Sequence, residues 1–458
     1  MRRVLAAVFS LSLGGCAHYT ARPLTHARIQ RALAVRPANA FWVKRARMLL
    51  PALPKLVVRA GEPLSPNLAA VVAVVADPSL RALRQQRAIA NAQVLTAGLL
   101  PNPTFSYGVG IPLSGAGLTD AFRAGLGLPI RAFITRGARL HAARLHAQDI
   151  DLGIAWQEWQ VASRAKTLVL TLQAESGELR LLTHEVRALS DSVALLSDAE
   201  AAGYATLGVA GAARLTLHQT QLSRLAVRQR MALEGLQLRA LLGVGAHAPL
   251  KIARPAHAKT GQASCLASRF WLHGLTSRRL DLLAMRRGYR SSNAALRAAI
   301  AGQFPAITIG LNRARDTSAI NTLGTGVSME LPFFNHNQGA IAQAKATRRA
   351  LFHRYVARVF TARAQIHQLL SRMHYLHREI QDVQSSVSAL QHLEHLYHTA
   401  LGKQRIAALT YYQLLGKAVS ERLLLLQDRS RMNALLVALE TASGRFERPM
   451  GCAAKKVS

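Results

Sequence analysis

The chain has 458 residues and a formal net charge of +35, with 58 Lys and Arg against 23 Asp and Glu. Such a charge often indicates nucleic-acid binding, but here the basic residues are spread along the whole chain and the N-terminus carries an export signal. We therefore exclude nucleic acid as a partner, and interpret the charge as a basic soluble surface or an adaptation to acidic surroundings.

Residues 1–15 have the pattern of a cleaved signal peptide. Arg2 and Arg3 precede an apolar run that is too short to span a bilayer and ends in Leu13-Gly14-Gly15-Cys16. This ending resembles the lipobox of bacterial lipoproteins, which implies that Cys16 becomes the lipidated, palmitate-bearing first residue. Ala17, in place of Asp, implies sorting to the outer membrane. The alternative is an ordinary signal peptide with a coincidental Cys.

Residues 16–76 are expected to form an extended, lipidated tether with a short helix near residues 40–50. Prolines interrupt the segment at Pro23, Pro37, Pro51, Pro54, Pro63 and Pro66. Because proline breaks helices and central strands, no long element is expected here.

Two stretches, 104–130 and 305–331, show the alternation of a β-hairpin with one apolar face and one small or polar face. The apolar set is Phe105, Tyr107, Val109, Phe122, Leu126 and Leu128 in the first hairpin, and Ile307, Ile309, Leu311, Val327 and Met329 in the second. The polar set, which we expect to face water, is Thr104, Ser106, Arg123, Thr308, Asn312, Ser328 and Glu330.

The two hairpins belong to a tandem repeat. Five landmarks recur at an offset that drifts only from about 204 to about 199 residues: Pro101 with Pro305, Leu128-Pro129 with Leu331-Pro332, Gly137 with Gly339, Gly203 with Gly402, and Gly243 with Gly444. We therefore divide the chain into repeat 1 at 77–243, a linker at 244–276, repeat 2 at 277–444 and a tail at 445–458.

A long helix follows each hairpin. Its apolar residues recur every 3.5 positions, as in a coiled coil: Leu168, Leu172, Leu179, Leu182, Val186, Leu189, Val193 and Leu196 in repeat 1, interrupted by Glu175, and Ile366, Leu369, Met373, Leu376, Ile380, Val383, Val387 and Leu390 in repeat 2. Each helix ends in a Gly-containing tip, near 203 and 402, and a return helix follows.

This order of elements resembles the TolC family of outer-membrane efflux channels, in particular the lipoproteins that serve resistance-nodulation-division pumps. The matching motifs lie between about residues 70 and 445: Asp77-Pro78-Ser79-Leu80, Leu99-Leu100-Pro101-Asn102-Pro103, Arg279-Leu280-Asp281-Leu282-Leu283-Ala284, Phe304-Pro305 and Leu331-Pro332-Phe333-Phe334-Asn335. The resemblance implies a mainly α fold with a small β part. It also implies a homotrimer with a twelve-stranded β-barrel in outer-membrane lipid and an α-helical periplasmic barrel. A periplasmic membrane-fusion adaptor and an inner-membrane transporter are the implied partners.

The hairpins are also expected to be completed by other copies of the chain, because four strands cannot close a barrel and open edges are not tolerated in lipid. The tips depart from the family pattern, which commonly has an Asp a few residues after the Gly. Here basic residues follow Gly402. The candidate residues for adaptor docking or gating are Gly203, Tyr204, Thr206, Gly402, Lys403 and Arg405.

Other chemistry is weakly indicated. His392, His395 and His398 step by three toward the second tip and are weak metal candidates; we favour solvated positions of a coiled coil. Cys265 and Cys452 form a possible disulfide in an exported protein. We find no catalytic triad, phosphate loop or paired carboxylates, so we expect neither an enzyme nor a cofactor.

The sequence thus predicts a passive exit duct of a tripartite efflux system. The alternatives are a lipid-anchored periplasmic coiled-coil adaptor or scaffold without a pore, and the outer-membrane channel of type I secretion.

Overall fold

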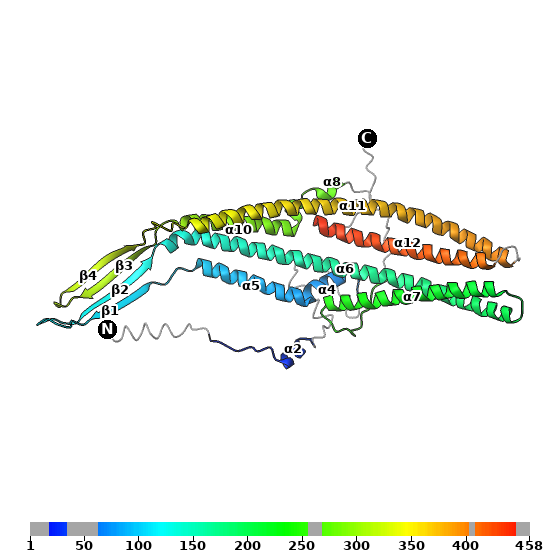
Figure 1. Cartoon of the computed structure of the whole chain (residues 1–458), viewed down its shortest axis with the longest axis horizontal. Coiled ribbons are helices and arrows are strands. Elements are labelled where there is room, and N and C mark those ends of the chain that lie inside the picture. The colour runs from blue at the N-terminus through cyan, green and yellow to red at the C-terminus, as the bar shows by residue number, and fades with distance from the viewer. Residues whose placement is uncertain (1–17, 34–62, 255–267, 403–407, 446–458) are drawn as a thin grey trace, which may run out of the picture.

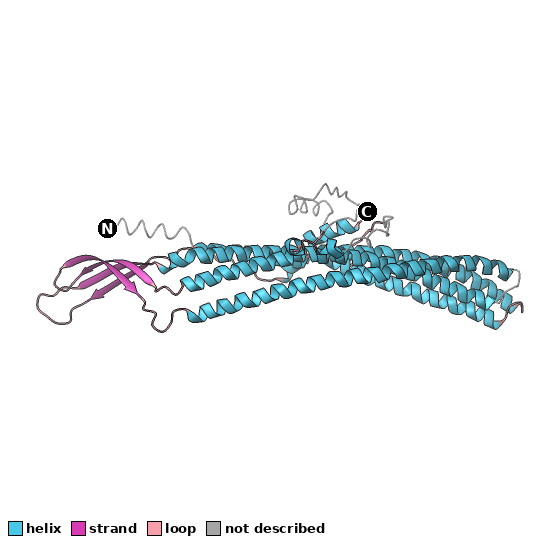
Figure 2. Cartoon of the chain, turned by 90° about the horizontal axis from the view of Figure 1, so that it is seen from above, coloured by secondary structure: helices cyan, strands magenta, loops and turns pink. Residues whose placement is uncertain are grey.

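The computed structural model describes residues 18–33, 63–254, 268–402 and 408–445. The molecule is a long rod with a small sheet at one end and helices over the rest of its length (Figure 1). Seen from above, the strands continue the direction of the helices (Figure 2). The expected mainly α fold with a small β part is confirmed.

Two long helices run most of the length of the rod: α6, Arg131–Ala201, and α11, Gln338–Gly402. With 71 residues, α6 is about 100 Å long. Each long helix is accompanied by two half-length helices that follow one another along it: α5 (Pro78–Gly98) and α7 (Leu207–Leu241) beside α6, and α10 (Leu280–Ala301) and α12 (Ala408–Ser443) beside α11. Because α10 and α12 also contact α6, the two repeats form one continuous helical assembly.

The sheet joins the two hairpins in the order β1-β2-β3-β4, all antiparallel. Its strands are β1 (Thr104–Gly110), β2 (Ala121–Pro129), β3 (Ile307–Arg315) and β4 (Asn321–Met329). The central pair, β2 with β3, connects repeat 1 to repeat 2, with Leu126 opposite Leu311.

The apolar seam of the long helices is buried where the 3.5-residue spacing predicts it. In α6 the buried seam residues include Leu172, Leu182, Val186 and Leu189, and in α11 they include Ile366, Met373, Val383 and Val387. The interruption at Glu175 is also buried, with 3% of the residue exposed. It accepts a hydrogen bond from Arg230 of α7, so a charge pair replaces an apolar contact at this position.

The end of the expected tether is a core helix, which corrects the sequence interpretation. Pro66–Ala76 forms α4, which packs on α6 and α7 and buries Ala69 and Ala73 completely. Pro66 does not break this helix, because proline fits the first turn of a helix. The Ser65 side chain caps that turn by accepting from the Leu68 N–H at 3.3 Å.

Three shorter features complete the described chain. Helix α2, His26–Leu33, is exposed, whereas the helix expected near residues 40–50 lies outside the described residues. In the linker, α8 (Ser268–Leu272) and α9 (Leu275–Arg278) pack against α11 and α10, and Leu64 forms a parallel bridge with Ile252.

Candidate functional site

The strand register gives the sheet two chemically different faces. Thr104 and Ser106 stand opposite Gly127 and Gly125, and Asn312 is also opposite Gly125. Following this register, the seven residues of the expected water-facing set share one face, because partners in a sheet point the same way. Glu330 lies just beyond β4, and its N–H donates to the Ala306 carbonyl at 3.1 Å, which continues the ladder by one step.

Glycines on this face make room for polar side chains of the neighbouring strands. A Cβ at Gly125 would lie 2.6 Å from Asn312 Oδ1 and 2.8 Å from Ser106 Oγ, and one at Gly127 would lie 2.8 Å from Thr104 Oγ1. The hydroxyl and amide groups of β1 and β3 therefore lean over β2, and together they form a continuous polar surface.

The opposite face is apolar and exposed. Its large side chains include Phe105, Tyr107, Leu126, Leu311, Leu323 and Val327, of which Phe105 is 70% and Val327 73% exposed. A patch of this kind on a described surface marks contact with lipid or protein. One departure was not expected from the alternation of Ile307, Ile309 and Leu311. Strand β3 continues past Asn312, and its register adds Arg313 and Arg315 to this face near the β3–β4 turn.

The sheet is open at both sides. Among the described residues, the outer edges of β1 and β4 have no strand partner. An unpaired edge presents free N–H and C=O groups, so it is a template for pairing with another chain.

The first helix tip is described in full, and Gly203 makes its reversal possible. Gly203 has φ +77°, a conformation that favours glycine. The next N–H, that of Tyr204, donates back to the Ala199 carbonyl at 2.7 Å. Tyr204 is 90% exposed, and Thr206, which is also exposed, is the N-cap residue just before α7. The tip therefore presents an aromatic ring and a hydroxyl to solvent.

The remaining candidate residues are those of the second tip, the cysteines and the three histidines, and only some of them are described by the structure. Gly402 is the last residue of α11, whereas Lys403, Arg405, Cys16, Cys265 and Cys452 lie outside the described residues. His392, His395 and His398 are exposed along α11. Within the described residues, no group of three or more His, Cys, Asp or Glu is arranged to hold a metal ion.

Ion pairs between the helices of the layer were not expected from the sequence. Arg422 of α12 bridges Glu185 of α6, at 3.1 Å, and Glu394 of α11. Arg230 of α7 similarly bridges Glu175 and Glu178 of α6 at 3.1 and 2.8 Å. The only signal in the sequence was an acidic residue on an apolar seam, at Glu175.

Glu234 extends this second cluster and has a raised pKa. Burial and then the charge of Glu175 raise the pKa of Glu234 to about 7, and burial also raises the pKa of Glu175. One carboxylate oxygen of each, Oε2, is buried without a donor among the described groups. A proton on Glu234 lets it donate to Glu175, so the two acids share a proton near neutral pH.

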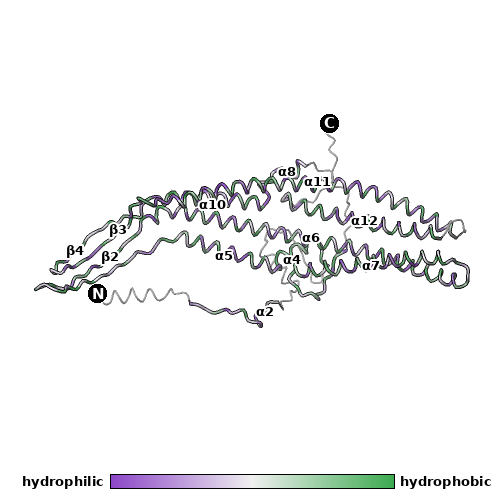
Figure 3. The backbone as a smooth tube through the Cα atoms, in the orientation of Figure 1, coloured by the Kyte–Doolittle hydropathy of each residue, from purple (hydrophilic) through white to green (hydrophobic). Residues whose placement is uncertain are grey.

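Hydrophobic and hydrophilic residues alternate along the long helices (Figure 3). Among the described residues, no single helix is long and apolar enough to cross a membrane; α4 and α5 reach that threshold only as a pair, bent by 51°.

Comparison of the sequence with family models and with curated proteins found no match. Comparison of the fold with solved structures found close matches. The channel-forming protein CusC superposes with a TM-score of 0.71 at 18% identity, covering 86% of this chain and 97% of CusC. The outer-membrane protein VceC of Vibrio cholerae gives 0.68 at 16%, covering 90% and 100%. The outer-membrane channel CmeC of Campylobacter jejuni gives 0.67 at 12%, covering 87% and 93%.

Proposed function

The chain has the fold of the TolC-like outer-membrane efflux channels, and on this premise we propose that it forms the outer-membrane exit duct of a tripartite efflux system. The observation that carries the proposal is the sheet: four strands with one exposed apolar face, one polar face and two edges that no other described strand pairs with. An apolar outer face and a polar inner face are what a transmembrane barrel requires.

Closure of the barrel needs further copies of the chain. A four-stranded sheet is too small to close on itself, and three copies supply twelve strands when β1 of one copy pairs with β4 of the next. The helices support the same assembly. In the half of the rod toward the tips, α7 exposes Leu215, Leu222, Leu225, Leu233 and Leu236, and α11 exposes Tyr375, Leu393 and Leu396. These two apolar surfaces lie on helices of different repeats, so each can pack against the other in a ring.

The remaining features define how the duct is attached and loaded. Cys16 carries the lipid anchor, and the polar face that includes Thr104, Ser106 and Arg123 lines the water-filled pore. The tips, with Tyr204 and Thr206 at the first and Lys403 and Arg405 at the second, dock a periplasmic membrane-fusion adaptor. Cargo arrives from an inner-membrane resistance-nodulation-division transporter, and the duct conducts it passively.

Reconstitution of the purified, detergent-solubilised protein into planar lipid bilayers tests this function. A duct produces discrete conductance steps, and Ser106→Trp, on the polar face, lowers the step size. Tyr107→Trp, one residue away on the apolar face, is the matched control and leaves the step size unchanged. A poreless adaptor or scaffold gives no steps with any variant. The type I secretion alternative shares the pore and is separated by the transporter encoded beside the gene.

A further inference from the structure

A pocket lies where the half-length helices of repeat 2 meet. Helix α12 ends at Ser443 and α10 begins at Leu280, and near this junction a cavity of about 530 Å³ is lined by α6, α11 and α12. The α12 side is formed mainly by small residues such as Ala434 and Ala438. Because these side chains are short, they leave open space between α6 and α11, and the polar side chains of these two helices form the walls of the cavity.

The charged groups that line this pocket are all cations. They are Arg164 on α6, Arg279 just before α10, and Arg358 and Arg372 on α11; of the described residues, no Asp or Glu belongs to the lining. Arg279 has a side chain only 2% exposed, and its guanidinium carbon lies 4.8 Å from the ring centroid of Trp156. A guanidinium held this deeply is fixed in position and poorly solvated, so an anion near it is attracted strongly.

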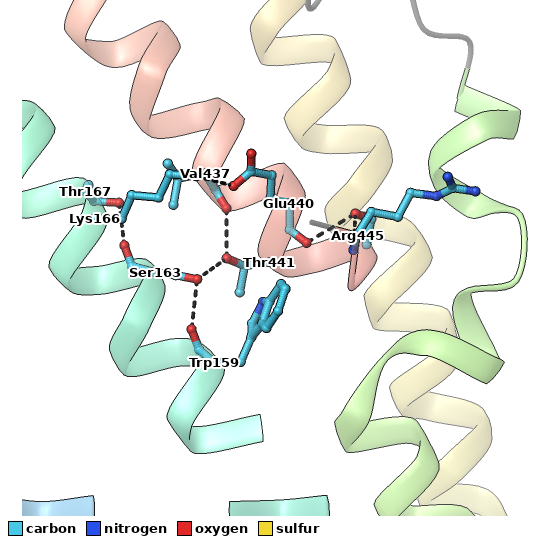
Figure 4. A network of polar contacts seen from close by, with 9 residues as sticks. Trp159, Ser163, Lys166, Thr167, Val437, Glu440, Thr441 and Arg445 are labelled. Carbon is cyan, nitrogen blue, oxygen red and sulfur yellow. Dashed lines mark hydrogen bonds and ion pairs between the residues drawn. The ribbon is translucent and has the colours of Figure 1, made fainter. Parts of the chain in front are cut away.

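One carboxylate partly neutralises the four arginines of the pocket. Asp281 accepts from Arg279 Nε at 2.8 Å and from Arg358 Nε at 2.7 Å. The nearest acidic group of α12 is already used: Figure 4 shows Glu440 paired with Lys166, at 2.7 Å, beside the hydrogen bond from Thr441 to Ser163 at 2.6 Å. Four guanidinium groups against one carboxylate leave three positive charges.

Two of the four arginines have no acidic partner in the part of the chain that the structure describes. Arg164 and Arg372 stand on opposite walls, and neither forms an ion pair with a carboxylate among the described residues. The amides of Gln160, Gln365 and Gln368 add further hydrogen-bond donors to the walls. Planar guanidinium groups bind carboxylate and phosphate through paired N–H donors, so the lining matches an anion with oxygen acceptors.

The pocket opens on the side of the layer away from α4. Ala165, Val169 and Leu172 of α6 lie in the cluster with α4. At about 100° per residue, Gln160, Ser163 and Thr167 of the pocket point the opposite way. In the proposed duct the helices form a narrow tube, which has room for the additional helix α4 only on its outer surface. The pocket lies on the opposite side of the layer and therefore faces the lumen.

We propose that this pocket is an anion-binding site in the lumen, and that the duct favours cargo carrying phosphate or carboxylate groups. The placement in the lumen rests on the proposed function, whereas the site itself rests on the four arginines. In a trimer, three such pockets form a cationic ring where the half-length helices meet, and this ring concentrates anions before they enter the strand region.

Two measurements on the full-length detergent-solubilised protein test the site. Isothermal titration calorimetry with inorganic pyrophosphate as the probe measures binding. The reversal potential in a KCl gradient measures the preference for anions. The double variant R164Q/R372Q removes the two unpaired charges, and R187Q/R378Q removes two exposed charges of the same helices that do not line the pocket.

We expect R164Q/R372Q to weaken pyrophosphate binding by at least about tenfold and to shift the reversal potential toward cation preference, while R187Q/R378Q changes neither. Equal behaviour of the two double variants, or no pyrophosphate binding by the unmodified protein at 0.15 M salt, overturns the site. If no variant conducts, the duct proposal fails, and the calorimetry still decides whether the anion site exists.

Discussion

Gly243 and Gly444 occupy equivalent positions in the two repeats and end the two return helices in the same way. Gly243 has φ +62° and Gly444 has φ +67°. In each case the following N–H donates to a carbonyl five residues earlier: Val244 to Arg239 at 3.0 Å, and Arg445 to Glu440 at 3.2 Å. Gly243 thus ends α7 beside the start of α5, and Gly444 ends α12 beside the start of α10.

Substitution of these glycines should therefore destabilise the junctions. A Cβ at Gly243 would lie 3.0 Å from the Ala76 carbonyl oxygen, and one at Gly444 would lie 3.2 Å from Arg279 Cα. Because the neighbouring atoms are backbone and φ is positive, we expect Gly243→Ala and Gly444→Ala each to cost about 1–2 kcal/mol. Thermal unfolding followed by circular dichroism measures the effect. Gly153→Ala, inside α6 with no neighbour near its Cβ position, should be neutral or stabilising; a similar loss in all three variants would argue against the junction role.

The acid pair Glu175 and Glu234 should make stability depend on pH. The folded chain holds the Glu234 proton with a pKa of about 7, above its ordinary value of 4.5. The contribution of Glu234 to the free energy of unfolding is therefore greatest below pH 4.5 and decreases as the pH rises through about 7. Glu234→Gln keeps a neutral side chain at every pH, so the fall in melting temperature between pH 5 and pH 8 should be smaller in this variant. Asp191→Asn, at an exposed position of the same α6–α7 region, should leave the fall unchanged; an unchanged fall in Glu234→Gln as well would refute the shared proton.

Adjacent residues of β4 should respond oppositely to a charge. Val327 is on the apolar face and Ser328 on the polar face. Val327→Arg places a charge against lipid, at a cost of about 2–4 kcal/mol if the residue lies near the bilayer midplane, whereas Ser328→Arg places it in water. We expect Val327→Arg to reduce the amount of folded protein recovered in outer membranes, and Ser328→Arg to leave it near normal. Equal recovery of the two variants would show that the apolar face does not meet lipid.

Asp281 is the only carboxylate that contacts two of the pocket arginines, as far as the described residues go. Arg279, with its side chain 2% exposed, depends on it for neutralisation. Asp281→Asn leaves this buried charge without its partner, and we expect a loss of about 3 kcal/mol in unfolding free energy. Denaturant titration measures the loss. The matched control Asp382→Asn, at an exposed position of α11, should change the unfolding free energy by less than about 0.5 kcal/mol.

Periodicity alone predicted the elements that repeat a simple rule. Alternation along Phe105 and Tyr107 located a strand, and the 3.5-residue spacing of Ile366 and Met373 located the α11 seam, because each pattern reports the geometry of one local element. Helix α4 was missed because the effect of a proline such as Pro66 depends on its position: proline breaks the interior of a helix but is favourable in the first turn. Only the apolar run after it, which packs on α6, decides between them.

The pocket arginines were beyond sequence reasoning for a different reason. Arg164 and Arg372 are 208 positions apart in the chain, and nothing local to either indicates that they line one cavity. The same holds for Arg422, whose partners come from two other helices. Ion pairs and pockets between elements depend on how the elements pack, which a local pattern does not specify. The two faces of the sheet, by contrast, follow from alternation once the register is fixed.

Closure of the sheet by three copies is the claim on which the rest depends, and cross-linking of its two edges tests it most directly. Phe105→Cys on β1 and Val327→Cys on β4, introduced together after replacement of Cys265 and Cys452 by Ser, place one thiol at each edge. Treatment of the protein in native outer membranes with a short bifunctional thiol reagent should link neighbouring copies. Denaturing gels should then show dimers and trimers and nothing larger, while each single-cysteine variant stays monomeric. Absence of cross-linked species in the double variant, or a ladder extending beyond three chains, would contradict the closed trimeric barrel.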